Sequence, residues 1–206
     1  MRTEAIEIIN YRGHDIEVFL DEDAPSPDEW GDDDAFIVYD HRDFCVKRDG
    51  FDPRDIYESM QNKYKQRKLY DGYWVFTLYA YIHSGVALSL GRNTYPFTDG
   101  WDVSTTGFVL VRRDKGTWSE NKAYKVAQSI VDEWNMFLSG DVYGYNSNAG
   151  SCWGFYGNEG KKQMIAEAKS EIDSHIHKLR HKHFNQLKIW IKNRVPLEYR
   201  KSFQLN

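Results

Sequence analysis

The sequence predicts an α+β fold: a largely antiparallel sheet of about six to eight strands, with two or three helices that include a long C-terminal helix. Residues 73–82, "YWVFTLYAYI", are aromatic and β-branched, which is typical of a strand. Apolar residues recur at helical spacing over residues 119–138 and again over 161–193. The order of the elements is β-β-β-α-β-β-β-α-β-β-α, which favours antiparallel pairing over repeated βαβ units.

The first third of the chain predicts short strands separated by an acidic loop. Residues 4–20 read as two strands around a turn at Arg12-Gly13. Residues 21–34, "DEDAPSPDEWGDDD", are predicted to form a loop because they combine proline, glycine and carboxylates. Residues 35–46 predict either a strand pair or one long bent strand. Pro53 suits the first turn of a surface helix over 53–68.

The middle of the chain predicts the centre of the sheet. Residues 73–82 are apolar on both faces, so we expect a central strand, with 86–90 returning after the "HSG" turn as its hairpin partner. Residues 106–112 predict another buried strand. The helix over 119–138 has Ser119 as its expected N-cap.

The last part of the chain predicts a hairpin and a helix. "DVYGYN" and "SCWGFYG" flank "SNAG" as two strands, and we interpret their glycines as packing positions beside bulky aromatic residues. One apolar stripe runs along the helix and comprises Ile165, Ala168, Ile172, Ile176, Leu179, His183, Leu187 and Trp190. We expect a core domain over 1–160, with the acidic loop 21–34, and a basic helix over 161–206 packed on or extending from it.

Charge is distributed unevenly along the 206 residues, whose net charge is −4. Residues 1–49 hold 15 acidic and 5 basic side chains, whereas residues 161–206 hold 4 acidic and 11 basic ones. The two cysteines do not make a disulfide framework. The chain shows no signal-peptide pattern and no apolar run of membrane-spanning length, so we expect a cytoplasmic protein without a membrane partner.

Three residues have the types needed for nucleophilic catalysis. Cys152 supplies a thiol, His83 an imidazole base and Asp102 a carboxylate that can orient the ring. His83 follows a predicted strand, where catalytic groups often lie. A cysteine within "SCWGF" is more often a small buried residue, and the spacing matches no hydrolase signature.

Metal and cofactor binding have weaker support in the sequence. His177 and His181 share a helix face, with His175 and His183 on adjacent faces, but only Asp173 is an acidic neighbour and no HExxH motif occurs. The glycine-rich motifs that cradle phosphates are also missing from the sequence. We therefore expect no metal and no cofactor.

The last helix suggests a nucleic-acid contact. Lys178, Arg180 and Lys182 lie among other cations that can contact phosphates. A solvated helix face is the simpler interpretation, since acidic residues interrupt the first half of the helix and no base-reading motif is present.

Four blocks carry a family resemblance: "YAYIHSGVALS", "WDVSTTGFVLV", "WNMFLSGDVYGY" and "SCWGFYG". In this order they resemble a family of small proteins encoded by bacteriophages and plasmids. The resemblance covers roughly residues 73–157 and implies a mobile-element origin. The resemblance assigns no catalytic residues. The acidic N-terminal third of the chain and the last helix lie outside the matching blocks.

The leading functional hypothesis is an accessory protein that binds and inhibits a host protein or ribonucleoprotein complex, such as a nuclease-based defence system. Carboxylates would take the place of phosphates and a tryptophan would anchor the contact. The residues of this surface are Asp21, Glu22, Asp23, Asp28, Glu29, Trp30, Asp32, Asp33 and Asp34. The alternatives are a small hydrolase or transferase that uses His83 with Cys152 or Asp102, and a nucleic-acid-binding protein.

Overall fold

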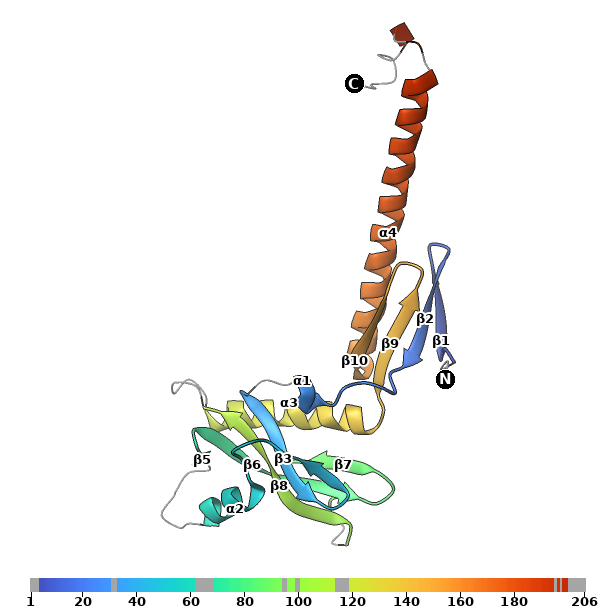
Figure 1. Cartoon of the computed structure of the whole chain (residues 1–206). Coiled ribbons are helices and arrows are strands. Elements are labelled where there is room, and N and C mark those ends of the chain that lie inside the picture. The colour runs from blue at the N-terminus through green and yellow to red at the C-terminus, as the bar shows by residue number, and fades with distance from the viewer. Residues whose placement is uncertain are drawn as a thin grey trace. The chain divides into compact units, whose positions relative to one another are not determined.

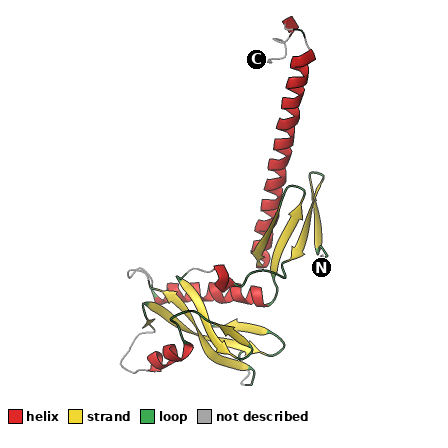
Figure 2. Cartoon of the chain, viewed as in Figure 1, coloured by secondary structure: helices red, strands yellow, loops and turns green. Residues whose placement is uncertain are grey.

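The computed structural model describes residues 4–30, 33–61, 69–93, 96–98, 101–113, 119–194, 196 and 198–199. The chain divides into two compact units: unit 1 comprises residues 1–19, 143–155 and 159–206, and unit 2 comprises residues 20–142 and 156–158. Ten strands and four helices lie within the described residues (Figures 1 and 2). The α+β class, the antiparallel pairing and the long C-terminal helix are confirmed.

Unit 2 is built on a six-stranded antiparallel sheet. Its strand order is β4-β3-β8-β6-β5, with β7 also paired to β6. The strands are β3 (Ala35–His41), β4 (Phe44–Val46), β5 (Leu69–Tyr70), β6 (Tyr73–Ile82), β7 (Val86–Ser89) and β8 (Val103–Arg112). The two longest strands, β6 and β8, pair with each other, so the predicted central position of residues 73–82 is confirmed.

The central strands of unit 2 are buried on both faces because a helix covers each face. Phe76 and Leu78 belong to the core cluster that contains the buried residues of helix α3 (Glu120–Leu138). Val75, which points the opposite way along β6, belongs to the cluster around Ile56 of helix α2 (Pro53–Gln61). This alternation is the period of two that a strand imposes on its side chains. Figure 1 shows α2 and α3 on opposite sides of the sheet.

Two local predictions are refined in unit 2. The segment 35–46 is a strand pair, since β3 and β4 are joined through Arg42 and Asp43. The acidic segment, predicted as a loop, contains one helical turn, α1 (Pro27–Trp30). Ser26 stabilises this turn because its hydroxyl donates to the Asp28 carboxylate at 2.6 Å. The predicted end of the second helix, after Gln61, lies outside the described residues.

Unit 1 is built on a four-stranded sheet of order β1-β2-β9-β10, covered by the start of helix α4 (Gly157–Arg194). The strands are β1 (Glu7–Tyr11), β2 (His14–Leu20), β9 (Val142–Ser147) and β10 (Ser151–Tyr156). Met164, Ala168 and Ile172 of α4 are buried in one cluster with Ile16 and Tyr145 of the sheet. The helix begins four residues before the predicted Lys161, at a glycine with φ of +64°.

Two glycines make room for aromatic rings. Gly144 does so as the sequence interpretation expects, whereas Gly154 has a φ of +84° with no atom near an added Cβ, and Gly157 lies against Met136. A Cβ atom on Gly144 of β9 would overlap the indole of Trp153 on β10. Trp153 also lies against Phe19, with ring centroids 5.8 Å apart. In unit 2, a Cβ on Gly107 would overlap the ring of Tyr39. The glycines at these positions therefore permit close packing.

Tyr145 provides a pH-dependent contribution to stability. Its hydroxyl donates to the Glu171 carboxylate at 2.8 Å, and burial, together with this contact, raises the pKa of Tyr145. Since the unfolded chain loses this proton near pH 10 while the folded chain keeps it, the free energy of unfolding should fall above about pH 10. Tyr145→Phe removes the hydroxyl and with it this pH-dependent contribution to the free energy of unfolding. The stability advantage of the wild type over the variant, measured by urea unfolding, should therefore shrink between about pH 8 and pH 11; an advantage that does not change with pH would contradict this account.

Candidate nucleic-acid interface

The second half of α4 is an exposed cationic helix, residues 177–194, which we call the basic arm. It contains six Lys or Arg and three His, and no Asp or Glu. Each of its side chains is exposed except that of Ile191, which is half-buried. Figure 1 shows this part of α4 continuing past the ends of β9 and β10. The basic arm therefore presents its charge to solvent.

The apolar stripe predicted for the last helix is a core face only in its first half. Leu179, Leu187 and Trp190 are 40%, 53% and 52% exposed. The physical reason is length. Strands of five to seven residues extend for roughly 20 Å at 3.3 Å per residue. A helix of 38 residues extends for roughly 57 Å at 1.5 Å per residue, so the sheet ends before the helix does.

Contacts between successive turns stabilise the basic arm. The Lys188 ammonium lies 4.8 Å from the centre of the Phe184 ring, and the Arg194 guanidinium lies 4.7 Å from that of Trp190. The Asn185 amide and the His181 ring share a hydrogen bond of 3.1 Å. Each pair is four residues apart and so lies on one helix face. The cations at the C-terminal end also favour the helix through its macrodipole.

The cations occupy two opposite sides of the basic arm. Successive residues are rotated by about 100° around a helix axis. This rotation groups four lysines on one side, the lysine side: Lys178, Lys182, Lys188 and Lys192. It places Arg180 and Arg194 on the opposite side, the arginine side. The predicted residues Lys178, Arg180 and Lys182 are thus brought onto one exposed helix, on both of its sides.

Lys188, which the sequence also identifies as a cation of this helix, lies on the basic arm as well. Two cations extend the interface beyond those identified from the sequence: Lys192 and Arg194. The sequence carries a signal for them, since no acidic residue occurs from Ser174 to Arg194. The apolar stripe points to a different role for this segment, because its helical spacing continues through both the buried and the exposed half of α4 and predicts a core-facing helix throughout.

The structure brings His83 and Asp102 together in unit 2. His83 lies in the turn between β6 and β7, and Asp102 lies directly before β8. The Asp102 carboxylate lies 3.3 Å from His83 Nδ1, and the Ile82 amide donates to the Asp102 carbonyl at 2.9 Å. The side chains are 65% and 36% exposed. This arrangement leaves Nε2 of His83 as the nitrogen that faces away from the carboxylate.

Removing this exposed pair should have little effect on stability. His83→Ala is expected to change the free energy of unfolding by less than about 1 kcal/mol, because solvent screens an ion pair of this kind. Asp102→Asn should have an effect of the same size. Chemical denaturation of both variants tests this expectation, and a loss above about 2 kcal/mol in either would assign the pair a structural role.

Cys152, the third candidate catalytic residue, lies in β10 and belongs to unit 1, whereas His83 and Asp102 belong to unit 2. Its side chain is half-buried and packs against the core cluster of unit 1. Its sulfur lies 4.0 Å from the backbone carbonyl oxygen of Trp153. This environment is that of a packed cysteine.

The acidic segment forms several contacts within its own unit. Asp33 pairs with Arg48, and Asp34 lies 3.3 Å from Arg112. The Asp21 amide donates to the Val142 carbonyl, and Glu29 accepts from Ser26. Of the remaining proposed partner-binding residues, Glu22, Asp23 and Asp28 are exposed, whereas Asp32 and the side chain of Trp30 lie outside the described residues.

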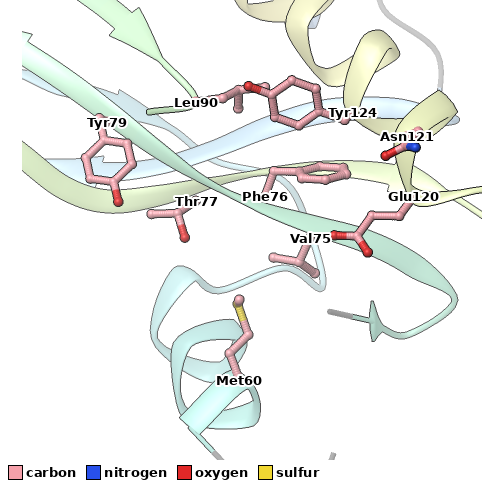
Figure 3. Close-up of a pocket in the computed structure, with 9 residues that line it drawn as sticks. All are labelled: Met60, Val75, Phe76, Thr77, Tyr79, Leu90, Glu120, Asn121 and Tyr124. Carbon is pink, nitrogen blue, oxygen red and sulfur yellow. The ribbon is translucent and has the colours of Figure 1, made fainter. Parts of the chain in front are cut away.

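A pocket lies in unit 2 beside β6, between α2 and the start of α3 (Figure 3). It has a volume of about 250 Å³. Met60 approaches from α2, whereas Tyr124 and Glu120 come from α3. The remaining lining residues are Val75, Phe76, Thr77, Tyr79, Leu90 and Asn121. None of the three candidate catalytic residues is among those that line it.

The described ranges hold neither a metal-ligand cluster nor a membrane-spanning helix. These ranges contain no group of three or more His, Cys, Asp or Glu residues that could hold a metal ion, and this includes the histidines of α4. Of the helices described, none combines the length and the apolar character that a membrane crossing requires.

The fold and the basic arm define the class of this chain as a small α+β protein that presents an exposed cationic helix. In comparisons with known proteins, no family model, no curated sequence and no solved structure matches it.

Proposed function

We propose that this protein binds nucleic acid through the basic arm. The observation that carries the proposal is the placement of six Lys or Arg residues on two sides of an exposed helix whose residues 177–194 include no Asp or Glu. Such a charge distribution attracts a polyanion, and each lysine or arginine that neutralises a phosphate releases a condensed counterion.

A nucleic acid fits the basic arm better than an anionic bilayer does. A helix that lies on a membrane needs a continuous apolar face with its cations on the opposite side. In the basic arm, Arg180 and Arg194 lie on the same side as Leu187 and interrupt its most apolar face. Burying this face in lipid would desolvate two guanidinium groups, which is costly.

A nucleic acid also fits better than an acidic protein surface. A flat protein surface covers one side of a helix and would leave either the lysine side or the arginine side without a counter-charge. The walls of a nucleic-acid groove carry phosphates on both sides of an inserted helix. Cations on both sides of the basic arm match this arrangement.

Fluorescence anisotropy with a labelled duplex of about 20 base pairs tests the proposal. If six phosphate contacts form, affinity should fall by about 10³-fold between roughly 50 and 200 mM salt. Sedimentation with vesicles that contain phosphatidylserine is the parallel assay. Binding to these vesicles without binding to nucleic acid would contradict the proposal, as would binding to neither.

The inhibitor and enzyme hypotheses stay predictions. The inhibitor hypothesis relies on the acidic segment, part of whose charge is paired within the chain through Arg48 and Arg112. The enzyme hypothesis relies on His83 and Asp102, which form a pair on an exposed turn. The mobile-element origin likewise stays a prediction from the resemblance.

A further inference from the structure

We infer that the nucleic acid is duplex DNA, and that the basic arm lies in its major groove with Gln186 and Asn193 facing the base pairs. This inference rests on the proposed function and adds the kind of nucleic acid and the residues that read it.

Gln186 and Asn193 lie on one side of the basic arm. They are seven residues apart, so they are two turns apart and differ by only about 20° around the helix axis. Both side chains are exposed. The side they share, together with Leu179, lies between the lysine side and the arginine side. The two amides therefore form the centre of a surface whose edges are cationic.

The chemistry of this surface matches the major groove of DNA. A B-form major groove is about 12 Å wide and accepts a single α-helix, with phosphates on both walls. Lysines would contact one wall and arginines the other. Glutamine and asparagine amides each have a donor and an acceptor, which pair with N7 and N6 of adenine, and an apolar side chain such as that of Leu179 suits a thymine methyl group.

The same geometry disfavours RNA and single strands. The major groove of an RNA duplex is too deep and narrow for side chains to read its bases. A single strand presents one backbone, so it offers no second wall for the arginine side. Duplex DNA is the nucleic acid that uses both sides of the basic arm and the amides between them.

The spacing of the amides predicts the spacing of the contacted bases. Seven residues at 1.5 Å each separate Gln186 and Asn193 by about 10 Å along the helix. That distance corresponds to about three base pairs at 3.4 Å each. Preferred sites should therefore contain two A·T pairs about three positions apart.

Selection from a library of duplexes with a randomised centre tests this inference. The full-length wild type should enrich sites with that spacing. The double variant Gln186→Ala/Asn193→Ala should lose the enrichment and bind the selected duplex at least about tenfold more weakly. Its affinity for unselected duplex should stay within about twofold, because the phosphate contacts remain. Gln163→Ala, which removes an exposed amide of α4 outside the basic arm, is the matched control and should keep the wild-type preference.

The outcomes separate this inference from the proposed function. Duplex binding without enriched sites would overturn the inference, and so would equal affinity for duplex RNA or for a single strand of the same sequence. Enrichment that persists in the double variant would also overturn it. In each of these cases nucleic-acid binding by the basic arm would stand, whereas binding to no nucleic acid would overturn both.

Discussion

Neutralising the first turn of the basic arm is expected to lower the affinity for duplex DNA by roughly 100-fold at low salt. The variant is Lys178→Gln/Arg180→Gln/Lys182→Gln, which removes three exposed cations. Because each lost phosphate contact removes about 0.9 from the slope of log K against log salt, the slope should become less steep by about 3. Anisotropy titrations of the wild type and the variant over a salt series measure both quantities.

The matched control removes the same charge from another part of the chain. Lys47→Gln/Lys122→Gln/Lys125→Gln replaces three exposed lysines of unit 2. If the basic arm carries the interface, this control should bind within about threefold of the wild type, since only the general field of the protein changes. An equal loss in the two triple variants would show that net charge, and not the basic arm, determines the affinity.

Gly107→Ala is expected to destabilise unit 2 by about 2–3 kcal/mol. Gly107 is paired with Tyr39 across β3 and β8, and an added Cβ would overlap the Tyr39 ring. That ring is fully buried and lies 5.2 Å from the ring of Phe44 between centroids. It therefore has no free space to move into, and overpacking of this kind displaces side chains or backbone. Urea unfolding measures the loss.

Two further variants isolate the cause of this effect. Gly85→Ala adds the same methyl group at a position with no atom within 4 Å, so it should change the free energy of unfolding by less than about 0.5 kcal/mol. In a Tyr39→Leu background, the cost of Gly107→Ala should fall because the ring is gone. A Gly107→Ala variant as stable as the wild type would contradict the packing account.

The spacing of apolar side chains along the sequence made most strands and helices predictable. The run 73–82 carries apolar residues on both faces, and the structure buries residues of both faces, between α2 and α3. The division of the strands between two sheets was not predictable in this way. Strand periodicity reports which residues face a core, but the partner of each strand is determined by contacts between residues far apart in sequence, such as Asn146 of β9 with Glu17 of β2.

The positive charge of the basic arm could be predicted from the sequence, but the exposure of its apolar side chains could not. The sequence identifies Lys178, Arg180 and Lys182 and places His83 at a strand end. Asp102 is expected in a loop, and its contact with His83 depends on the tertiary structure. The apolar spacing of α4 is the same on both sides of Ile176, so it cannot show where the supporting sheet ends. The pairing of Asp33 with Arg48 likewise depends on the tertiary structure.

Photocrosslinking of the full-length wild type to duplex DNA that carries a halogenated uracil in place of thymine tests the central claim most directly. Mass spectrometry of the digested adducts identifies the peptides that contact the bases. If the basic arm is the interface, the crosslinked peptides should come from residues 177–194, with Trp190, which lies one turn after Gln186, as the aromatic acceptor. Adducts confined to other parts of the chain would contradict the claim that this helix binds nucleic acid.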